Sequence, residues 1–256
     1  MKVTVVVATH KPYAMPADSL YLPLHVGAEG KESIGFTGDN TGEHISAKNP
    51  QFCELTGLYW AWKNVDADYI GLAHYRRHFR GKGKGEPLSR VLTEQEAIRL
   101  LEGKDGLLPQ KRNYYIETLY SHYAHTMHVE PLDVAGEIIR EKYPAYAPAF
   151  EALKHRTAAH MFNMMVLRRD HLDAYCTWLF DILFELERRV DATAYDAFHG
   201  RFFGRVSELL LDVWLSQQNL DLVEVPVIGM EKTNWLKKGG SFLMAKFFGK
   251  KYDKSF

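Results

Sequence analysis

The chain has 256 residues, of which 46% are hydrophobic and 25% are charged. This composition is typical of a soluble globular protein and excludes a disordered chain, a fibrous repeat and a small disulfide scaffold. Lys plus Arg and Asp plus Glu both number 32, so the formal net charge is zero, which argues against a wholly basic nucleic-acid-binding protein. No apolar run approaches the ~18 residues that span a bilayer.

Cysteine usage and the N-terminal residues indicate the compartment. The two cysteines, Cys53 and Cys176, do not have the spacing of a metal site. The apolar run at the N-terminus is too short for a signal-peptide core followed by a cleavage site. We therefore expect reduced thiols and a cytoplasmic protein.

The first part of the chain predicts a strand, a long loop region and a helix. Residues 3–8 form a continuous, largely β-branched run, which is typical of a strand buried on both faces. Residues 16–49 are irregular in pattern, and we expect a long loop there. Asn49, a favourable N-cap, and Pro50 then open a predicted helix. Its apolar stripe consists of Phe52, Leu55, Tyr59 and Trp62.

Strands and helices alternate over the rest of the chain, without an internal repeat. Strands are expected over residues 68–74, 106–109, 161–167 and 222–228. Helices are expected over residues 93–101, 131–142, 170–189 and 206–217, the first of them opened by a capping box at Thr93 and Glu96. This alternation predicts a single α/β domain over residues 1–230, with a mixed, mainly parallel central sheet flanked by helices.

The C-terminal segment, residues 231–256, differs from this domain. It contains seven lysines and two acidic residues, with phenylalanines between them. A basic, aromatic segment of this kind can lie on an anionic membrane surface. The alternative is a solvated C-terminal helix that packs on the domain.

The run His74-Tyr75-Arg76-Arg77 lies at the carboxyl end of a predicted strand. Ligands of open α/β sheets bind at this edge, and arginine offers a fixed fork of donors to a phosphate or diphosphate. In an extended segment Arg76 and Arg77 would point to opposite faces, so that one binds ligand and the other pairs with an acid. The alternative is that both arginines form surface salt bridges.

Other polar residues are candidates by position. Thr9, His10 and Lys11 follow the first predicted strand, where a loop commonly meets a nucleotide, or they form an ordinary turn. Glu54 lies off the apolar stripe of its helix, and its spacing favours a solvated face over a cleft. Glu208 can act as a general base or accept a sugar hydroxyl, or it only matches the charge of its helix's first turn.

Two patterns suggest metal ligands but do not predict a metal site. His122, His125 and His128 drift around a helix and lack a completing carboxylate or Cys, so one histidine that contacts substrate or phosphate is the better interpretation. The pair Asp66 and Asp68 matches the Asp-x-Asp metal motif of glycosyltransferases. It precedes its strand, however, and so lies at the edge opposite to the one where such a motif meets ligand.

Several blocks of the sequence together resemble one known family. They are Asn49–Asn64, which includes Glu-Leu-Thr-Gly-Leu-Tyr-Trp, Tyr69–Arg77, which ends in His-Tyr-Arg-Arg, and the shorter runs 162–164, 175–180 and 204–208. In this order they are similar to the DUF4422 family of bacterial capsular and exopolysaccharide glycosyltransferases. The resemblance covers roughly residues 3 to 230.

The resemblance implies a GT-A-like fold and transfer of a hexose, galactofuranose or galactose, from a UDP-sugar. The implied acceptor is a lipid-linked or other oligosaccharide of capsule, exopolysaccharide or O-antigen synthesis, at the inner face of the plasma membrane. His74, Glu54 and Glu208 are the implied catalytic residues. The implied donor-binding residues are Thr9, His10, Lys11, Tyr75, Arg76, Arg77, His125, Asn163 and Arg205.

The resemblance also bears on cofactors and on rival functions. His74 and the arginines fall where GT-A enzymes place Asp-x-Asp, so we expect cations to replace the metal, with Mn²⁺ or Mg²⁺ as the alternative. Two rival functions remain. One is a non-catalytic glycan or sugar-nucleotide binding subunit of a polysaccharide assembly complex, and the other is a phosphosugar transferase, which releases nucleoside monophosphate.

Overall fold

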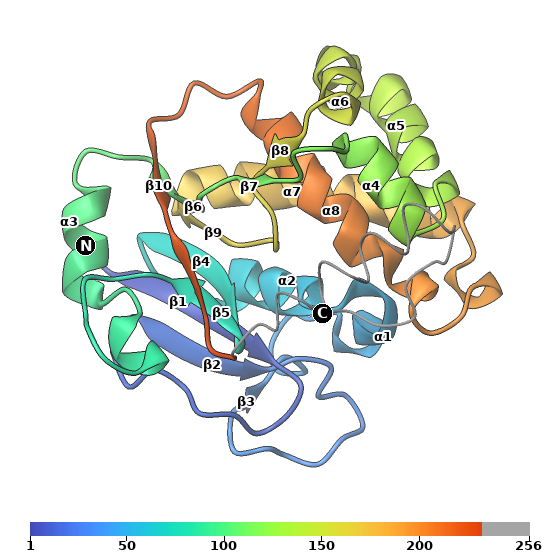
Figure 1. Cartoon of the computed structure of the whole chain (residues 1–256). Helices are drawn as coiled ribbons and strands as arrows, with labels where there is room; N and C mark the ends of the chain where they lie inside the picture. The colour runs from blue at the N-terminus through green and yellow to red at the C-terminus, as the bar shows by residue number, and fades with distance from the viewer. Residues whose placement is uncertain (232–256) are drawn as a thin grey trace.

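A computed structural model describes residues 1–231 of the chain. Its centre is a twisted sheet whose main path has the strand order β10-β6-β9-β4-β1-β2-β3 (Figure 1). The strands of this path are β1 (Val3–Thr9), β2 (Tyr21–His25), β3 (Thr37–Gly38), β4 (Tyr69–His74), β6 (Gly106–Pro109), β9 (Met165–Arg168) and β10 (Leu222–Val225). Along this path β9 alone runs against the others. The predicted mixed, mainly parallel sheet is confirmed.

Four further strands lie off this path. β5 (Arg77–Phe79) folds back on β4 through the pair His74 and Arg77 and also pairs with β11 (Val227–Gly229). β7 (Arg112–Asn113) and β8 (Ala158–Ala159) form a separate antiparallel pair. The hairpin of β4 and β5 is short, so the residues of its turn stay at the carboxyl edge of the main sheet.

Helices cover both faces of the sheet. The α-helices are α1 (Asn49–Phe52), α2 (Leu55–Asn64), α3 (Glu94–Leu101), α4 (Leu119–Thr126), α5 (Glu130–Lys142), α6 (Ala147–Lys154), α7 (Arg169–Arg189) and α8 (Phe202–Leu215). The 3₁₀ helices are η1 (Ser46–Lys48), η2 (Pro87–Arg90), η3 (Pro144–Tyr146), η4 (Ala192–Ala194) and η5 (His199–Arg201). Figure 1 shows α3 apart from the group that α2, α7 and α8 form. None of the helices in residues 1–231 has the length and apolar character needed to cross a membrane.

The sheet separates two hydrophobic cores, which explains the continuous β-branched run of β1. Val6 and Ala8 face the larger core with α2, α7 and α8, while Val5 and Val7 face the smaller core with α3. Both sets are almost fully buried, because successive side chains of a strand point to opposite faces.

Four predicted elements differ from the structure. The helix expected from Asn49 is interrupted at Cys53, whose left-handed φ of 54° ends α1 before α2 begins. Asn49 is not an N-cap; its side-chain amide donates to the carbonyl oxygen of Cys53 at 2.7 Å. The expected loop over 16–49 contains β2, and the expected strand over 161–167 begins only at Met165. The expected strand over 222–228 is two strands, separated at Pro226, which lacks an N–H for the ladder.

Candidate functional site

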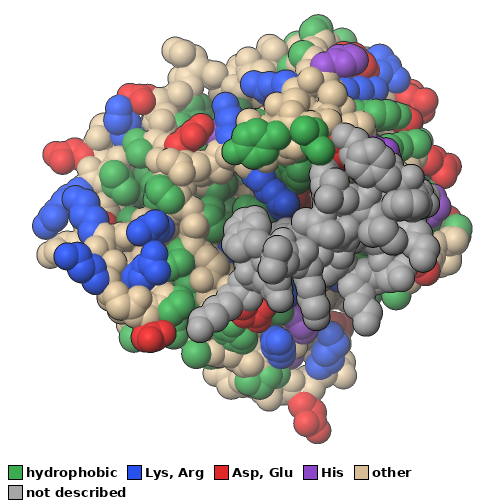
Figure 2. All heavy atoms as spheres, in the orientation of Figure 1, with side chains coloured by type: hydrophobic (Ala, Val, Ile, Leu, Met, Phe, Trp, Pro, Cys, Tyr) green, Lys and Arg blue, Asp and Glu red, His purple; other side chains and the backbone are tan. Residues whose placement is uncertain are grey.

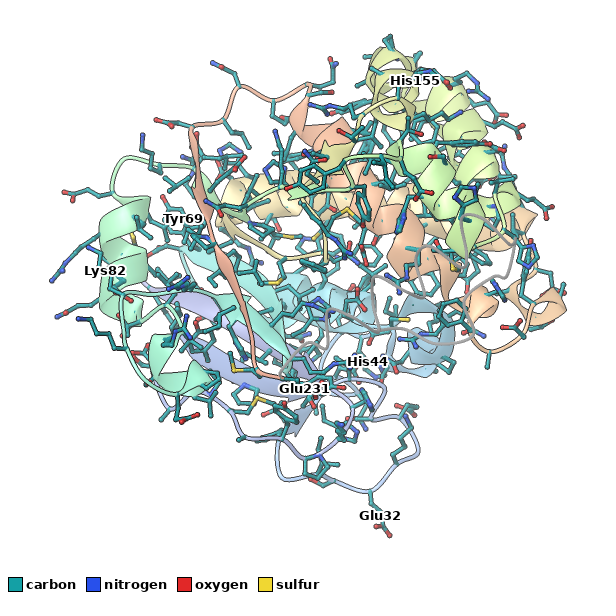
Figure 3. All side chains as sticks on the ribbon, viewed as in Figure 1. Glu32, His44, Tyr69, Lys82, His155 and Glu231 are labelled. Carbon is teal, nitrogen blue, oxygen red and sulfur yellow. The ribbon has the colours of Figure 1, made fainter. Side chains whose placement is uncertain are left out.

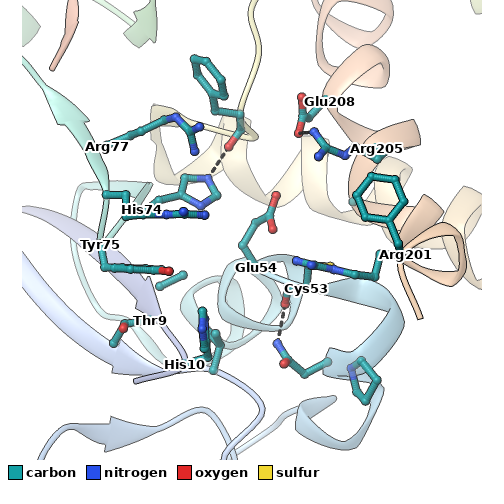
Figure 4. Close-up of a pocket in the computed structure, with 18 of the residues that line it drawn as sticks. Thr9, His10, Cys53, Glu54, His74, Tyr75, Arg77, Arg201, Arg205 and Glu208 are labelled. Atoms are coloured by element: carbon teal, nitrogen blue, oxygen red, sulfur yellow. Dashed lines mark hydrogen bonds and ion pairs between the residues drawn. The ribbon is translucent and has the colours of Figure 1, made fainter. Parts of the chain in front are cut away.

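A cavity of about 510 Å³ opens at the carboxyl ends of β1 and β4 (Figure 4). The two strands are parallel neighbours, with Ala8 opposite His74, so the residues that follow them meet at one edge. The break between α1 and α2 and the first turns of α8 form two further parts of the wall. These four main segments, far apart in the sequence, are joined by single residues of other segments.

The charges that line this cavity are unbalanced. On the face shown in Figure 2, acidic and basic side chains of the described residues are interspersed. Around the cavity, six basic side chains accompany only two carboxylates, Glu54 and Glu208. The basic residues are Lys31, Arg76, Arg77, Arg112, Arg201 and Arg205. A concave site with this excess of guanidinium groups attracts phosphate and other anions.

Glu54 lies in the middle of the cavity, at the break between the two helices (Figure 4). The side-chain amide of Asn163 donates to Glu54 Oε1 at 2.8 Å. Burial raises the pKa of Glu54, but the positive charge of His74 and the Asn163 amide outweigh it and hold that pKa below its ordinary value. Glu54 is thus held as a carboxylate. The interpretation of Glu54 as a solvated residue is wrong, because the break at Cys53 turns its side chain into the cavity.

Glu208 lies two turns into α8 and is 7% exposed. Its carboxylate is 3.4 Å from Nη1 of Arg205, one turn earlier. Burial raises the pKa of Glu208, with a further rise from Glu54 and an opposing effect of Arg205. The two carboxylates of one cavity therefore have pKa values displaced in opposite directions, a pattern that separates roles in acid–base catalysis.

A turn at Phe162 and Asn163 contacts all three predicted catalytic side chains. The ring Nε2 of His74 donates to the carbonyl oxygen of Phe162 at 2.5 Å, and the backbone of Phe162 also hydrogen-bonds to Glu208. Asn163 holds Glu54 and is itself 1% exposed, with its Oδ1 accepting from the Ser207 hydroxyl at 2.7 Å. Both turn residues have left-handed φ angles, 76° at Phe162 and 52° at Asn163. Asn tolerates such an angle better than most residues do. The strand begins later than expected because of this turn.

The cavity brings together most of the predicted donor-binding residues. Thr9, His10, Tyr75, Arg76, Arg77 and Arg205 line it. The segment is not extended as expected: the chain turns between β4 and β5, and both Arg76 and Arg77 line the cavity. Arg76 also forms an ion pair with Glu231, with 3.8 Å between Nη1 and the carboxylate. Glu231 is labelled in Figure 3. Burial lowers the pKa of His10, and neighbouring positive charges lower it further.

Three predicted donor-binding residues do not line the cavity. Lys11 places its ammonium 5.3 Å from the centre of the Tyr75 ring. Asn163 is buried and donates to Glu54, which does line the cavity. His125, on α4, donates through Nδ1 to Glu117 at 2.8 Å.

The two metal-like patterns hold no metal site in the described part of the chain. α4 ends at Thr126, so His128 lies beyond the helix that carries His122 and His125. Asp68 is exposed at the opposite edge of the sheet, where it accepts from the backbone N–H of Lys2. Within residues 1–231, no group of three or more His, Cys, Asp and Glu side chains is arranged to hold a metal ion.

Several lining residues could not be found from the sequence. Arg112, on β7, places its guanidinium 4.8 Å from the Tyr114 ring, and both line the cavity. Arg201 donates through Nε to the Cys53 sulfur at 3.0 Å, while burial raises the pKa of this thiol to about 11. Arg112 and Tyr114 belong to no motif. Arg201 begins the run Arg201–Glu208, in which the sequence singles out Arg205 and Glu208.

Comparison with solved structures finds the fold in a known enzyme. WbbM, described as a bifunctional glycosyltransferase in its apo structure, is 31% identical and superposes with a TM-score of 0.83 over 91% of this chain. The chain spans 46% of the length of WbbM. Glucosyl-3-phosphoglycerate synthase from Mycobacterium tuberculosis, solved with Mg²⁺ and UDP, is 11% identical with a TM-score of 0.32, covering 96% of this chain and 75% of its own.

Comparison with curated proteins finds no match. The family comparison does: residues 4–219 match DUF4422, whose description is a domain of unknown function. This match covers most of the chain and includes every one of the four segments that build the cavity. The chain is therefore a member of the DUF4422 family.

Proposed function

We propose that the protein is a glycosyltransferase that moves a hexose from a UDP-sugar to a lipid-linked or other oligosaccharide acceptor of bacterial surface polysaccharide. One observation carries the proposal: six basic side chains surround two carboxylates at the carboxyl ends of β1 and β4, in a chain of zero net charge. The likeness to the glycosyltransferase WbbM supports it. Galactofuranose and galactose are the sugars that the family resemblance favours.

The donor site of this proposal lies between β1 and the turn after β4. Thr9 and His10 contact the uridine, and Arg76 and Arg77 contact the diphosphate, whose two phosphates each carry a negative charge. Negative charge grows on the diphosphate as it departs, and cations already held in place stabilise that charge without reorganisation. The arginines and His74 take the part that a divalent metal takes in other sugar transferases.

The two carboxylates have separate roles in the transfer, which we propose to be inverting. Glu208 is the general base, because its raised pKa brings it nearer to the pH at which a base is most effective. The acceptor oxygen attacks the anomeric carbon, its proton passes to Glu208, and the bond to the diphosphate breaks with its electron pair leaving on UDP. Glu54 stays ionised and stabilises the positive charge that develops on the donor sugar.

Product analysis tests this proposal directly. The purified protein is incubated with UDP-hexoses, without acceptor and with excess chelator, and the released nucleotide is identified. Slow release of UDP from one donor is expected, and Glu208→Gln should slow it. A phosphosugar transferase would release UMP, and a pure glycan-binding or nucleotide-binding subunit would release nothing; either result would refute the proposal.

A further inference from the structure

The basic side chains of the cavity form two groups, at opposite ends. At the β1 end, the positive charges that act on His10 include Lys31, Arg76 and Arg201. At the α8 end, the charges that act on Tyr114 are Arg112, Glu208 and Arg205. Charges of both groups act on Arg77, with Arg76 the strongest of them. Figure 4 shows Thr9 and His10 at one end, Arg77, Arg205 and Glu208 at the other, and Glu54 between them.

Two guanidinium groups near the α8 end of the cavity lie close to one aromatic ring, that of Phe162. The guanidinium carbons of Arg77 and Arg112 lie 4.7 and 5.9 Å from the centre of the Phe162 ring. Arg112 also lies over Tyr114, and Arg205 stands beside Glu208. Arg77 is assigned to the diphosphate, and among the other described residues at this end Arg112 and Arg205 accompany one carboxylate, Glu208. The positive charge of Arg112 therefore exceeds the pair of Arg205 and Glu208.

A nucleotide donor does not balance the charge that the described residues give to the cavity. Among residues 1–231, the six basic lining residues exceed the two carboxylates by four positive charges, histidines aside. The diphosphate of a nucleoside diphosphate sugar supplies one negative charge on each phosphate. Like charges held together in a partly buried site are unfavourable until an anion neutralises them. The remaining excess lies where the general base is expected to meet the acceptor.

We infer that Arg112 and Arg205 form a second anion subsite, beside Glu208, that binds a carboxylate or phosphate group of the acceptor. The inference rests on the proposed function, because the end of the cavity nearest β1 is assigned to the nucleotide. Planar guanidinium groups match both anions with paired N–H donors. The substrate class is thus an acidic acceptor, with either an acidic sugar or a phosphate link near the reacting hydroxyl.

Calorimetric titration with two ligands tests the subsite. Protein saturated with UDP is titrated with D-glucuronate, with glucose 1-phosphate, or with neutral glucose. At least one of the two anions should bind in the presence of UDP, and glucose should not. Binding of the glucuronate alone indicates an acidic sugar, and binding of the phosphate alone indicates a phosphate link. Loss of one charge-assisted contact in Arg112→Gln should weaken the anion by about tenfold or more.

The controls separate failure of the inference from failure of the proposed function. Arg99→Gln, an exposed residue of α3, should leave both ligands unaffected. Absence of UDP binding would overturn the proposed function itself. UDP binding with no anion binding, displacement of the anion by UDP, or an anion affinity unchanged in Arg112→Gln would each overturn the second subsite alone.

Discussion

Asn163 is expected to keep Glu54 ionised, and its removal should raise the pKa of that carboxyl group. The amide is almost fully buried and donates to Glu54 Oε1 at 2.8 Å and to the Gly204 carbonyl oxygen at 3.0 Å. We choose Asn163→Gly, because glycine adopts the left-handed φ of 52° without strain. The substitution therefore removes the amide and leaves the turn.

The size of the effect follows from the contact that is lost. A hydrogen bond to a charged group contributes about 1.5–3 kcal/mol, and one pKa unit corresponds to about 1.36 kcal/mol. The pKa of Glu54 should therefore rise by about one to two units. The positive charge of His74 remains in the variant and keeps the shift from growing further.

The shift can be measured without any substrate. The carboxyl carbons of glutamate are labelled with ¹³C and titrated by NMR, and the Glu54 resonance is identified by its loss in Glu54→Gln. Ser207→Ala provides the matched control, because it removes the hydroxyl that orients Asn163 and leaves the amide bond to Glu54 in place. The pKa of Glu54 should shift less in Ser207→Ala than in Asn163→Gly. A pKa of Glu54 in Asn163→Gly within a few tenths of a unit of the wild-type value would refute the reasoning.

Three further outcomes are expected. Glu208→Gln should lower the transfer rate by about 10²–10⁴-fold and leave the affinity for UDP within a few-fold; near-normal turnover would remove Glu208 as the base. Burial lowers the pKa of His78 from 6.5 to about 4, so the unfolded state binds the proton more readily and acid below pH 6.5 destabilises the fold. Urea unfolding at pH 8 and pH 5 should therefore show that His78→Phe loses about 2 kcal/mol less free energy of unfolding over this range than the wild type does. Gly71→Ala should cost about 1–3 kcal/mol in the same assay, because its Cβ would lie 2.5 Å from the Met165 carbonyl oxygen. Gly204→Ala, with ordinary contacts of 3.6 Å or more, should cost little, and equal losses in the two variants would contradict this account.

The sheet could be predicted because its signals are local. The β-branched run of β1 and the strand of β4 predict neighbours buried on both faces, and both elements lie at the expected positions. The capping box of Thr93 and Glu96 is present at the start of α3. The carboxyl ends of parallel strands lie at one edge of a sheet. Thr9, His10 and the segment after β4 could therefore be assigned to the same edge from the sequence.

The orientation of Glu54 could not be predicted, because it depends on a backbone break. Cysteine rarely adopts a left-handed φ, so Cys53 gave no sign that α1 ends there. A continuous helix places Glu54 off the buried stripe, and the break reverses that conclusion. The same holds at Phe162, where a left-handed turn replaces the start of a predicted strand.

The far wall of the cavity depends on tertiary contacts alone. Arg112 lies on β7 and Arg201 on η5, both short elements, and both residues line the same cavity as the β4–β5 turn. The basic segment over 231–256 lies outside the described residues, apart from Glu231. Its contact with a membrane therefore stays a prediction from the sequence.

The most direct test of the central claim is the thermal stability of the protein with UDP-sugars in the presence and absence of EDTA. A ligand at about 100 times its Kd stabilises the folded state by about 2.7 kcal/mol, or roughly 5–10 °C in Tm for a chain of this size. The account predicts such a rise with a UDP-hexose, undiminished by EDTA and reduced in Arg76→Gln. A rise that disappears in EDTA and returns with Mn²⁺ would contradict the metal-free site, and no rise with any nucleotide sugar would contradict the donor site as a whole.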